Sequence, residues 1–468
     1  MWIIRRPIRF VASAGALILL LAFLTTHTLL GLPATAQNHT ATITLDLDKH
    51  NQTMSGWEAT LGLPDNPLEP EWADYADEIQ DRAVNEVGLN RVRLEIRSGA
   101  ENNTGIVTKF VSGQLEYKTF RESFYEVNND NDDAMVINWD GFDFSELDWH
   151  IETVVLPLQA LMEARGDPLI INLCYVSFRS GDYVHKDPEE YAEFVLATYL
   201  HMQEHYGFVP ETWEVILEPD LRHQMWNGVE MGHAMVATSK RLQENGFTPA
   251  FVVPSVTNMR NTLPYMDQIA SVPGAMEHVV EMSYHRYKGR SRGTLNNIAK
   301  MATRLGIRTS MLEWWFGHGT HDVLHEDLKI GNVSAWQGRV LTGHFDIPKN
   351  GNREAPVRLR KEVRYNVQYF RHVRSGAVRV DAKSNKTKWA DPLAFVNPDG
   401  STTVVINAKR ESEFVVRGLP ADDYFVSYAI ENNSVELPTP INISDGGELH
   451  TGIPGKGVLT ITSREILE

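Results

Sequence analysis

Short apolar runs rich in β-branched residues alternate with longer amphipathic stretches through the middle of the chain. The runs have the length of buried strands, and most of the stretches between them repeat apolar residues at helical spacing. Repeated strand–helix units of this kind predict a parallel sheet covered by helices. We expect strands at 53–60, 90–96, 168–176, 213–217, 250–254, 278–284, 308–312 and 333–336.

The stretch 188–205 illustrates the expected helices. Pro188 and Glu189 are typical of a first helical turn, and Gly207 is typical of a helix end. Eight strand–helix units over this length predict a (β/α)8 TIM barrel, with a doubly wound open sheet as the alternative. No glycine-rich phosphate loop follows any expected strand, which excludes the usual nucleotide-binding proteins.

Beyond about residue 375 the pattern changes to short alternating runs that are separated by turn clusters, such as the one at 397–400. This change predicts a smaller all-β sandwich domain. The segment 41–47 also alternates apolar and polar residues, and we expect it to pair with the sandwich. The expected organisation is a terminal segment at 1–36, an N-terminal strand at 37–50, a barrel at 51–374 and a sandwich at 375–468.

The first 36 residues have the pattern of an export signal. Arginines precede an apolar run at 11–32, and Ala34 and Ala36 supply the small residues that signal peptidase accepts before Gln37. The apolar run is long enough to leave an uncleaved membrane anchor as the alternative. In both cases the globular part is expected outside the cytoplasm, as a secreted, periplasmic or cell-surface protein.

Composition and charge restrict the partners further. The 468 residues are 42% hydrophobic and 22% charged, which is typical of an ordinary folded protein, and the formal net charge is −17. We therefore expect no nucleic-acid partner, because phosphate binding requires a basic surface. The single cysteine, Cys174, excludes an internal disulfide and lies in an apolar run, where a buried thiol is expected.

Two glutamates follow expected strands directly. Glu218 follows 213–217 and Glu313 follows 308–312. In a parallel barrel the functional groups lie at the carboxyl ends of the strands, so we expect these side chains to face each other across the barrel mouth. One carboxyl group that donates a proton, and a second that attacks or activates water, are what glycoside hydrolysis requires. The alternative for each glutamate is an ordinary loop or ion-pair residue.

Other side chains near the expected strand ends could support these carboxyl groups. A carboxylate that must stay ionised needs a cation or a hydroxyl donor beside it, and Arg93 and Tyr287 are the candidates. Arg93 could instead pair with Glu95. His285 could orient either acid or bind sugar. Tryptophan rings offer flat platforms for sugars, with core packing as the alternative for any single ring, and the candidates are Trp57, Trp226, Trp314, Trp315 and Trp336.

The placement of the two acids, after the fourth and seventh expected strands, resembles that of the clan A glycoside hydrolases. Within the clan the chain is most similar to family 30. The segment 54–57 resembles that family's first barrel strand, His285 and Tyr287 resemble its His-x-Tyr after strand 6, and 365–380 is similar to its last barrel helix. The segment 201–218 is also similar to family 39.

This resemblance implies a retaining β-glycosidase that works by double displacement. Glu313 would be the nucleophile and Glu218 the acid/base residue. The implied substrate is a β-linked oligo- or polysaccharide, with glucan, galactan and xylan all open, and no cofactor is expected.

One position departs from the clan. An asparagine usually precedes the acid/base residue and contacts the sugar 2-hydroxyl, whereas this chain has Leu217. Asp220, His223 and Asn227, in the loop beyond, could replace that contact or could be ordinary loop residues. The departure leaves a non-catalytic carbohydrate-binding or cell-surface protein on the same fold as the alternative function.

A histidine-rich segment raises a metal hydrolase as a rival. His321 and His325 have an i,i+4 spacing that can bind zinc, and His318 lies nearby. Lys329 stands where a His-Glu-x-x-His motif would need its second histidine, so a polar loop and helix start is favoured and we expect no metal site. No Gly-x-Ser-x-Gly elbow is present, which argues against a serine hydrolase.

Overall fold

The structure is a computed structural model that describes residues 39–61, 70–179, 181–221, 225–348 and 355–464. Residues Ala41–Glu468 belong to one compact unit. The expected export signal or membrane anchor at 1–36 lies outside the described residues. Among the helices that are described, none combines the length and apolarity that crossing a bilayer requires.

Within the described part of the chain, eight strands pair in parallel and in chain order, and the last closes onto the first to form a barrel. Every strand overlaps one of the expected apolar runs, and the predicted (β/α)8 barrel is confirmed. The strands are β2 (Gly56–Thr60), β3 (Arg91–Arg97), β4 (Ile170–Val176), β5 (Thr212–Glu214), β6 (Phe251–Asn258), β7 (Val279–Lys288), β8 (Arg308–Glu313) and β9 (Val333–Trp336).

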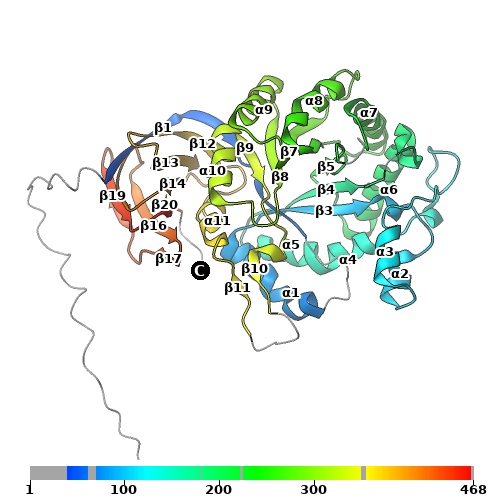
Figure 1. Ribbon diagram of the computed structural model, residues 1–468, viewed down its shortest axis with the longest axis horizontal. Coiled ribbons are helices and arrows are strands. Elements are labelled where there is room, and N and C mark those ends of the chain that lie inside the picture. Colours follow the sequence, from blue (N-terminus) through cyan, green and yellow to red (C-terminus); the bar gives the residue numbers. More distant parts are fainter. Residues whose placement is uncertain (1–38, 62–69, 180, 222–224, 349–354, 465–468) are drawn as a thin grey trace, which may run out of the picture. The chain divides into compact units, whose positions relative to one another are not determined.

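Helices lie outside the barrel strands, as Figure 1 shows for α6 to α9. The longest of the described helices, α6, starts after Asp187, whose side chain accepts a hydrogen bond from the Glu189 amide, and ends at Gly207 with a φ of 76°. The helices are α1 (Pro70–Arg82), α2 (Ile106–Val111), α3 (Tyr117–Ser123), α4 (Ser145–His150), α5 (Leu156–Ala164), α6 (Pro188–Tyr206), α7 (Gly228–Glu244), α8 (Thr262–Ala270), α9 (Arg292–Leu305), α10 (His321–Ile330) and α11 (Val363–Phe370).

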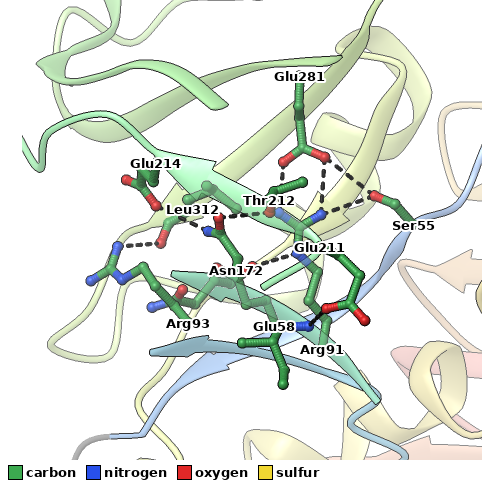
Figure 2. A network of polar contacts seen from close by, with 12 residues as sticks. Ser55, Glu58, Arg91, Arg93, Asn172, Glu211, Thr212, Glu214, Glu281 and Leu312 are labelled. Carbon is green, nitrogen blue, oxygen red and sulfur yellow. Dashed lines mark hydrogen bonds and ion pairs between the residues drawn. The ribbon is translucent and has the colours of Figure 1, made fainter. Parts of the chain in front are cut away.

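The interior of the barrel contains a buried ion network (Figure 2). Arg91 donates from both terminal nitrogens to the two oxygens of Glu281 at 2.9 Å, and its Nε donates to Glu58 at 2.5 Å. Ser55 accepts a further hydrogen bond from Arg91 at 3.1 Å. The network joins β3 to β2 and β7, so charged residues fill a part of the interior that apolar side chains occupy in most barrels.

A second, antiparallel sheet is built from the C-terminal part of the chain and from β1 (Thr40–Thr53), which pairs with β12. Val426 and Leu449, which lie near opposite edges of this sheet, belong to one apolar core, so the sheet folds over on itself as a sandwich, which confirms the predicted all-β second domain. The other strands are β12 (Val378–Ser384), β13 (Ala390–Val396), β14 (Thr402–Ala408), β15 (Ser412–Arg417), β16 (Asp422–Ile430), β17 (Asn433–Glu436), β18 (Ile441–Ile443), β19 (Glu448–Ile453) and β20 (Gly457–Thr462). A short hairpin of β10 (Phe345–Asp346) and β11 (Arg358–Leu359) stands apart.

The last barrel helix contacts this second sheet. Gln368 of α11 accepts a hydrogen bond from Ser427 of β16 through its side chain and another from Thr460 of β20 through its carbonyl oxygen. The two cores are therefore joined by specific polar contacts as well as by the chain itself.

Candidate active site

The two glutamates that the sequence singled out meet at the carboxyl ends of the barrel strands. Glu313 is the last residue of β8, and Glu218 lies just beyond β5. One carboxylate oxygen of each and one ring nitrogen of His285 lie within 4.8 Å of one another. Both glutamates are buried, with 7% of Glu218 and 5% of Glu313 exposed. Two acids this close and this buried need partners or a task.

Glu313 is held by two donors. Nη2 of Arg93 donates to one carboxylate oxygen at 2.7 Å, and the Tyr287 hydroxyl donates to the other at 2.7 Å. Arg93 also pairs with Glu95 at 3.1 Å, so both alternatives considered for this arginine are present together. Burial raises the pKa of the Glu313 carboxyl, while the charge and hydrogen bond of Arg93 and the charge of His285 oppose that rise.

Glu218 sits at an irregular turn of the backbone. β5 ends at Glu214, earlier than predicted, and the Glu218 amide then donates to the Ser255 carbonyl at 3.1 Å. Glu218 has a φ of 50°, in the left-handed region that non-glycine residues rarely adopt. A strained backbone at a buried acid is typical of functional sites, where neighbouring structure holds the residue in place.

His285, on β7, links the two acids. Its Nδ1 lies 2.8 Å from Oε1 of Glu218, within hydrogen-bond distance. Burial acts to lower the pKa of the His285 ring, but the negative charge of Glu313 and the hydrogen bond to Glu218 outweigh it, so the pKa is raised. The ring nitrogen Nε2 is buried and has no hydrogen-bond partner among the described residues. His285 can therefore exchange a proton with Glu218 while facing Glu313.

The same three side chains, Glu218, His285 and Glu313, form the group of potential metal ligands found among the described residues. The positive charge that a metal would bring to Glu313 is already supplied by Arg93. His285 Nδ1 is also engaged by Glu218. The geometry fits a pair of acids that take part in proton transfer better than it fits an ion-binding site.

The histidines of the segment that suggested a metal hydrolase do not lie around a common point. His318 stacks on Trp314, with ring centroids 5.3 Å apart, and His321 stacks on Tyr365 at 4.3 Å. His325 hydrogen-bonds the Tyr369 hydroxyl at 3.0 Å. His321 and His325 thus pack between α10 and α11, whereas His318 packs within the segment that joins β8 to α10.

Among the tryptophan candidates, Trp315 lies beside the acids. The Arg93 guanidinium lies over its ring, 5.6 Å from the centroid, and the ring is partly exposed. Trp314 is also partly exposed, but it packs between His318 and the guanidinium of Arg290. Among these tryptophans, Trp315 is therefore the ring that lies beside the arginine of Glu313 and keeps part of its surface exposed.

Three predicted sugar platforms are core residues instead. Trp57, Trp226 and Trp336 are each about 1% exposed. Trp57 stacks on Phe370, Trp226 donates to the Tyr183 hydroxyl at 2.9 Å, and Trp336 donates to Asp327 at 3.0 Å. The substrate-binding prediction for these rings was wrong, because a side chain at a strand end can face the surrounding helices as well as the mouth.

The loop residues offered as replacements for the missing asparagine have structural roles. Asp220 accepts hydrogen bonds from the amides of Thr257 and Asn258, and Asn227 caps α7. His223 lies outside the described residues. Leu217 is buried against Cys174 and Val176, so the position before Glu218 is part of a small apolar cluster.

Sequence reasoning missed several aromatic residues around the mouth. Tyr125 packs against the cluster of Leu217, and Phe178 and Phe316 are exposed just beyond β4 and β8. The two phenylalanines closely follow expected strands, which is a signal in the sequence, whereas Tyr125 lies far from any expected strand.

Comparison with known proteins identifies the fold. No protein-family model matches the chain, and no curated protein matches its sequence. Solved structures do match over 90–91% of this chain. A family 30 endoxylanase from Clostridium papyrosolvens is 16% identical and covered over its whole length, with a TM-score of 0.63. A family 30 subfamily 8 xylanase from Clostridium acetobutylicum is 15% identical and also fully covered, at 0.62.

An endo-β1,6-glucanase is 15% identical and covered over 94% of its length, with a TM-score of 0.60. The barrel-plus-sandwich fold of this chain is thus the fold of glycoside hydrolase family 30, and the resemblance predicted from the sequence is confirmed at the level of fold.

Proposed function

We propose that the chain is a retaining glycoside hydrolase that cleaves β-linked glycans, with Glu313 as the nucleophile and Glu218 as the acid/base residue. The observation that carries this proposal is the meeting of the two carboxyl groups, with oxygen atoms within 4.8 Å, at the carboxyl ends of the barrel strands. Retaining enzymes separate their carboxyl groups by about 5 Å, whereas inverting enzymes leave roughly 6.5–9.5 Å for a water molecule. The separation therefore favours retention.

In the first step, Glu313 attacks the anomeric carbon as the bond to the leaving oxygen breaks, and Glu218 transfers its proton to that oxygen. Arg93 and Tyr287 donate hydrogen bonds to Glu313, which stabilise the ionised form that attacks. The attacking electron pair then passes into the new glycosyl–carboxylate bond, and the leaving sugar departs as a neutral alcohol.

In the second step, Glu218 removes a proton from a water molecule, whose oxygen attacks the anomeric carbon and releases Glu313 as a carboxylate. His285 hydrogen-bonds Glu218 and can accommodate the changing charge of that carboxyl group. Two inversions at one carbon give net retention. None of these steps calls for a cofactor.

The substrate class follows from the fold and from the site. The neighbouring structures described as endoxylanases and as an endo-β1,6-glucanase make β-linked xylan and β-1,6-glucan the first polysaccharides to test. The export pattern at residues 1–36 supports action outside the cytoplasm, where such polymers occur.

The test uses a panel of β-1,4-xylan and β-1,6-glucan together with 4-nitrophenyl β-xyloside and β-glucoside. Wild-type protein should release sugar or nitrophenol, with the β-anomer as the first product in proton NMR. Glu313→Gln should lose activity by at least about 10⁴-fold, as expected for removal of a covalent catalyst. Azide should restore turnover to Glu218→Ala on the nitrophenyl glycosides, because nitrophenolate leaves without a proton and azide attacks the glycosyl-enzyme without a general base. An α-anomer as first product would contradict retention.

The apolar surroundings of Leu217 favour a second candidate, a non-catalytic carbohydrate-binding protein. An amide that strengthens its contact with the 2-hydroxyl in the transition state is absent at that position. This candidate predicts retardation of the wild type by the same polysaccharides in native gels without release of product. Measurable turnover that disappears in Glu313→Gln would exclude it.

A further inference from the structure

Exposed aromatic side chains are rare in this protein and have a common location. Among the described phenylalanine, tyrosine and tryptophan side chains, those that are more than about a third exposed are Tyr117, Trp139, Phe178 and Phe316. Each lies in a segment that follows the carboxyl end of a barrel strand: β3 for the first two, β4 for Phe178 and β8 for Phe316. The acids lie at that same end of the barrel.

Phe178 and Phe316 lie on opposite sides of the mouth. They follow β4 and β8 closely, and these strands are four apart in either direction around the closed barrel of the described chain. Glu313 also belongs to β8, whereas Glu218 follows β5, the neighbour of β4. A line drawn from one phenylalanine to the other therefore crosses the region of the two acids.

Side-chain contacts lead from each phenylalanine to the surroundings of one acid. Phe316 packs against Trp315, with ring centroids 6.5 Å apart, and Trp315 lies under the arginine that holds Glu313. On the other side, Phe178 packs edge-on against Tyr125 at 5.5 Å, and Tyr125 contacts the cluster of Leu217, the residue before Glu218. Two series of contacts thus lead outward, one from the arginine that holds Glu313 and one from the residue before Glu218.

Phe316 is unusual in its own right. It is 82% exposed, and its φ of 58° lies in the left-handed region that a bulky side chain rarely adopts. An apolar ring gains nothing from such exposure in the free protein. Backbone strain and an exposed aromatic ring at the mouth of a site together point to a bound ligand.

We propose that Phe178 and Phe316 are sugar-binding platforms at the two ends of the site, so that the substrate is a glycan chain lying across the mouth from β4 to β8. This inference rests on the proposed glycosidase function. A chain held on both sides of the acids is cut at an internal linkage. The faces of pyranose rings carry C–H groups that pack on aromatic rings, which suits neutral β-linked polymers.

The test compares Phe178→Ala, Phe316→Ala and the double variant with wild type on the polysaccharide of the panel and on its 4-nitrophenyl monosaccharide. Each single variant should lose roughly tenfold in kcat/KM on the polymer, the effect of uncovering part of one ring, with a larger loss in the double variant. The loss on the nitrophenyl glycoside should be much smaller, because that substrate is too short to reach both rings. Tyrosine at either position should restore most of the polymer activity.

Leu305→Ala is the matched control, since Leu305 is 37% exposed at the end of α9, before β8 begins. It should behave as wild type on both substrates. Equal losses of kcat/KM on the polymer and on the nitrophenyl glycoside, or no loss on the polymer, would overturn the proposed platforms without contradicting the proposed glycosidase activity.

Native-gel retardation by the polysaccharide gives a readout that does not need turnover. Retardation should weaken in both phenylalanine variants, and unchanged retardation would also overturn the proposal. A wild type that neither binds nor cleaves any polymer of the panel would contradict the platforms and the proposed function together.

Discussion

Charge around Glu313 and Glu218 is balanced by very few groups. Arg93 pairs with Glu313 and Glu95, and the raised pKa of His285 keeps a proton next to Glu218 over a wider pH range than an ordinary histidine would. A protonated His285 ring can donate its proton to the Glu218 oxygen that it contacts at 2.8 Å. Loss of the ring proton removes this proton from the path to the leaving oxygen.

His285→Asn should remove the ionisation of the His285 ring from the alkaline limb of the pH profile of kcat/KM. The histidine pKa is raised above its ordinary value of 6.5, so wild type should keep the ring proton, and with it activity, until the pH rises through that raised pKa. The variant has no ring proton to lose, so its profile should lack this step. The measurement is kcat/KM from pH 4 to 9 on an unactivated substrate, and an alkaline limb identical to that of wild type would contradict a role for the His285 proton.

Some residue roles follow from chemistry and others depend on which way a side chain faces. Arg93, Tyr287 and His285 were proposed because an acid pair needs donors, and all three contact the glutamates. The tryptophans were proposed from their positions near strand ends. Successive strand residues face opposite sides of a barrel, and Trp57 faces Phe370 of α11. The position of a residue in the sequence does not by itself reveal which side of the barrel its side chain faces.

At the scale of elements, strands β2, β3 and β7 are held together inside the barrel by the Arg91 network. Glu281 binds Arg91 through both oxygens, and Glu58 contacts it through one. Complete burial raises the pKa of Glu58 to about 7, although Arg91 opposes the rise. Burial also acts to raise the pKa of Glu281. The charge and hydrogen bonds of Arg91 outweigh that effect, so the pKa of Glu281 is lowered. Glu281 is the ionised partner, and Glu58 takes up its proton as the pH falls through about 7.

Glu281→Gln should destabilise the protein by about 3 kcal/mol or more, because it breaks the bidentate pair and leaves the buried positive charge of Arg91 without its ionised partner. Glu58→Gln should cost less, since glutamine resembles the protonated acid. The measurement is urea unfolding of both variants at pH 7. A larger loss in Glu58→Gln than in Glu281→Gln would contradict this assignment of charge.

The same network predicts a pH dependence of stability. A carboxyl whose pKa rises from 4.5 to about 7 on folding binds its proton more tightly in the folded state. Its stabilising contribution is present below pH 4.5 and is lost as the pH rises through about 7. Glu58→Gln should remove this part of the decline between pH 4.5 and 7 in the free energy of unfolding. If the free energy of unfolding of Glu58→Gln fell more steeply between pH 4.5 and 7 than that of wild type, the raised pKa would be contradicted.

The strands of the barrel could be predicted because buried parallel strands are short, continuous apolar runs. The end of β5 could not, since 215–217 is as apolar as a strand. The backbone instead leaves the ladder after Glu214 so that the amides of Leu217 and Glu218 bond to carbonyls of β4 and β6. Tertiary contacts decided that boundary, and they also decide where Glu218 sits.

At the scale of the whole molecule, β1 connects the two cores. Its alternating residues Ala41, Ile43 and Leu45 are buried in the second core, and the chain then runs into β2 of the barrel. The alternation at 41–47 carried this information, because one face of β1 is apolar and the other polar. The contacts of Gln368 with the second sheet had no comparable pattern in the sequence.

Ile43→Ala should lower the free energy of unfolding by about 2–5 kcal/mol, the usual loss for a large aliphatic side chain removed from a core. Thr44→Ala, on the exposed face of the same strand, is the matched control and should change it by less than about 0.5 kcal/mol. Denaturant unfolding followed by tryptophan fluorescence measures both. Equal changes in the free energy of unfolding for the two variants would contradict the packing of β1 against the second core.

The most direct test of the central claim is mass spectrometry of the protein after reaction with 2,4-dinitrophenyl 2-deoxy-2-fluoro-β-xylobioside or its glucose counterpart. The fluorine slows both steps, and the good leaving group keeps the first step fast enough for the glycosyl-enzyme to accumulate. We predict one added disaccharide per protein, located by peptide mapping on Glu313, and no addition in Glu313→Gln. A label on another residue, or no label in a wild type that hydrolyses the matching unfluorinated glycoside, would contradict a covalent intermediate on Glu313.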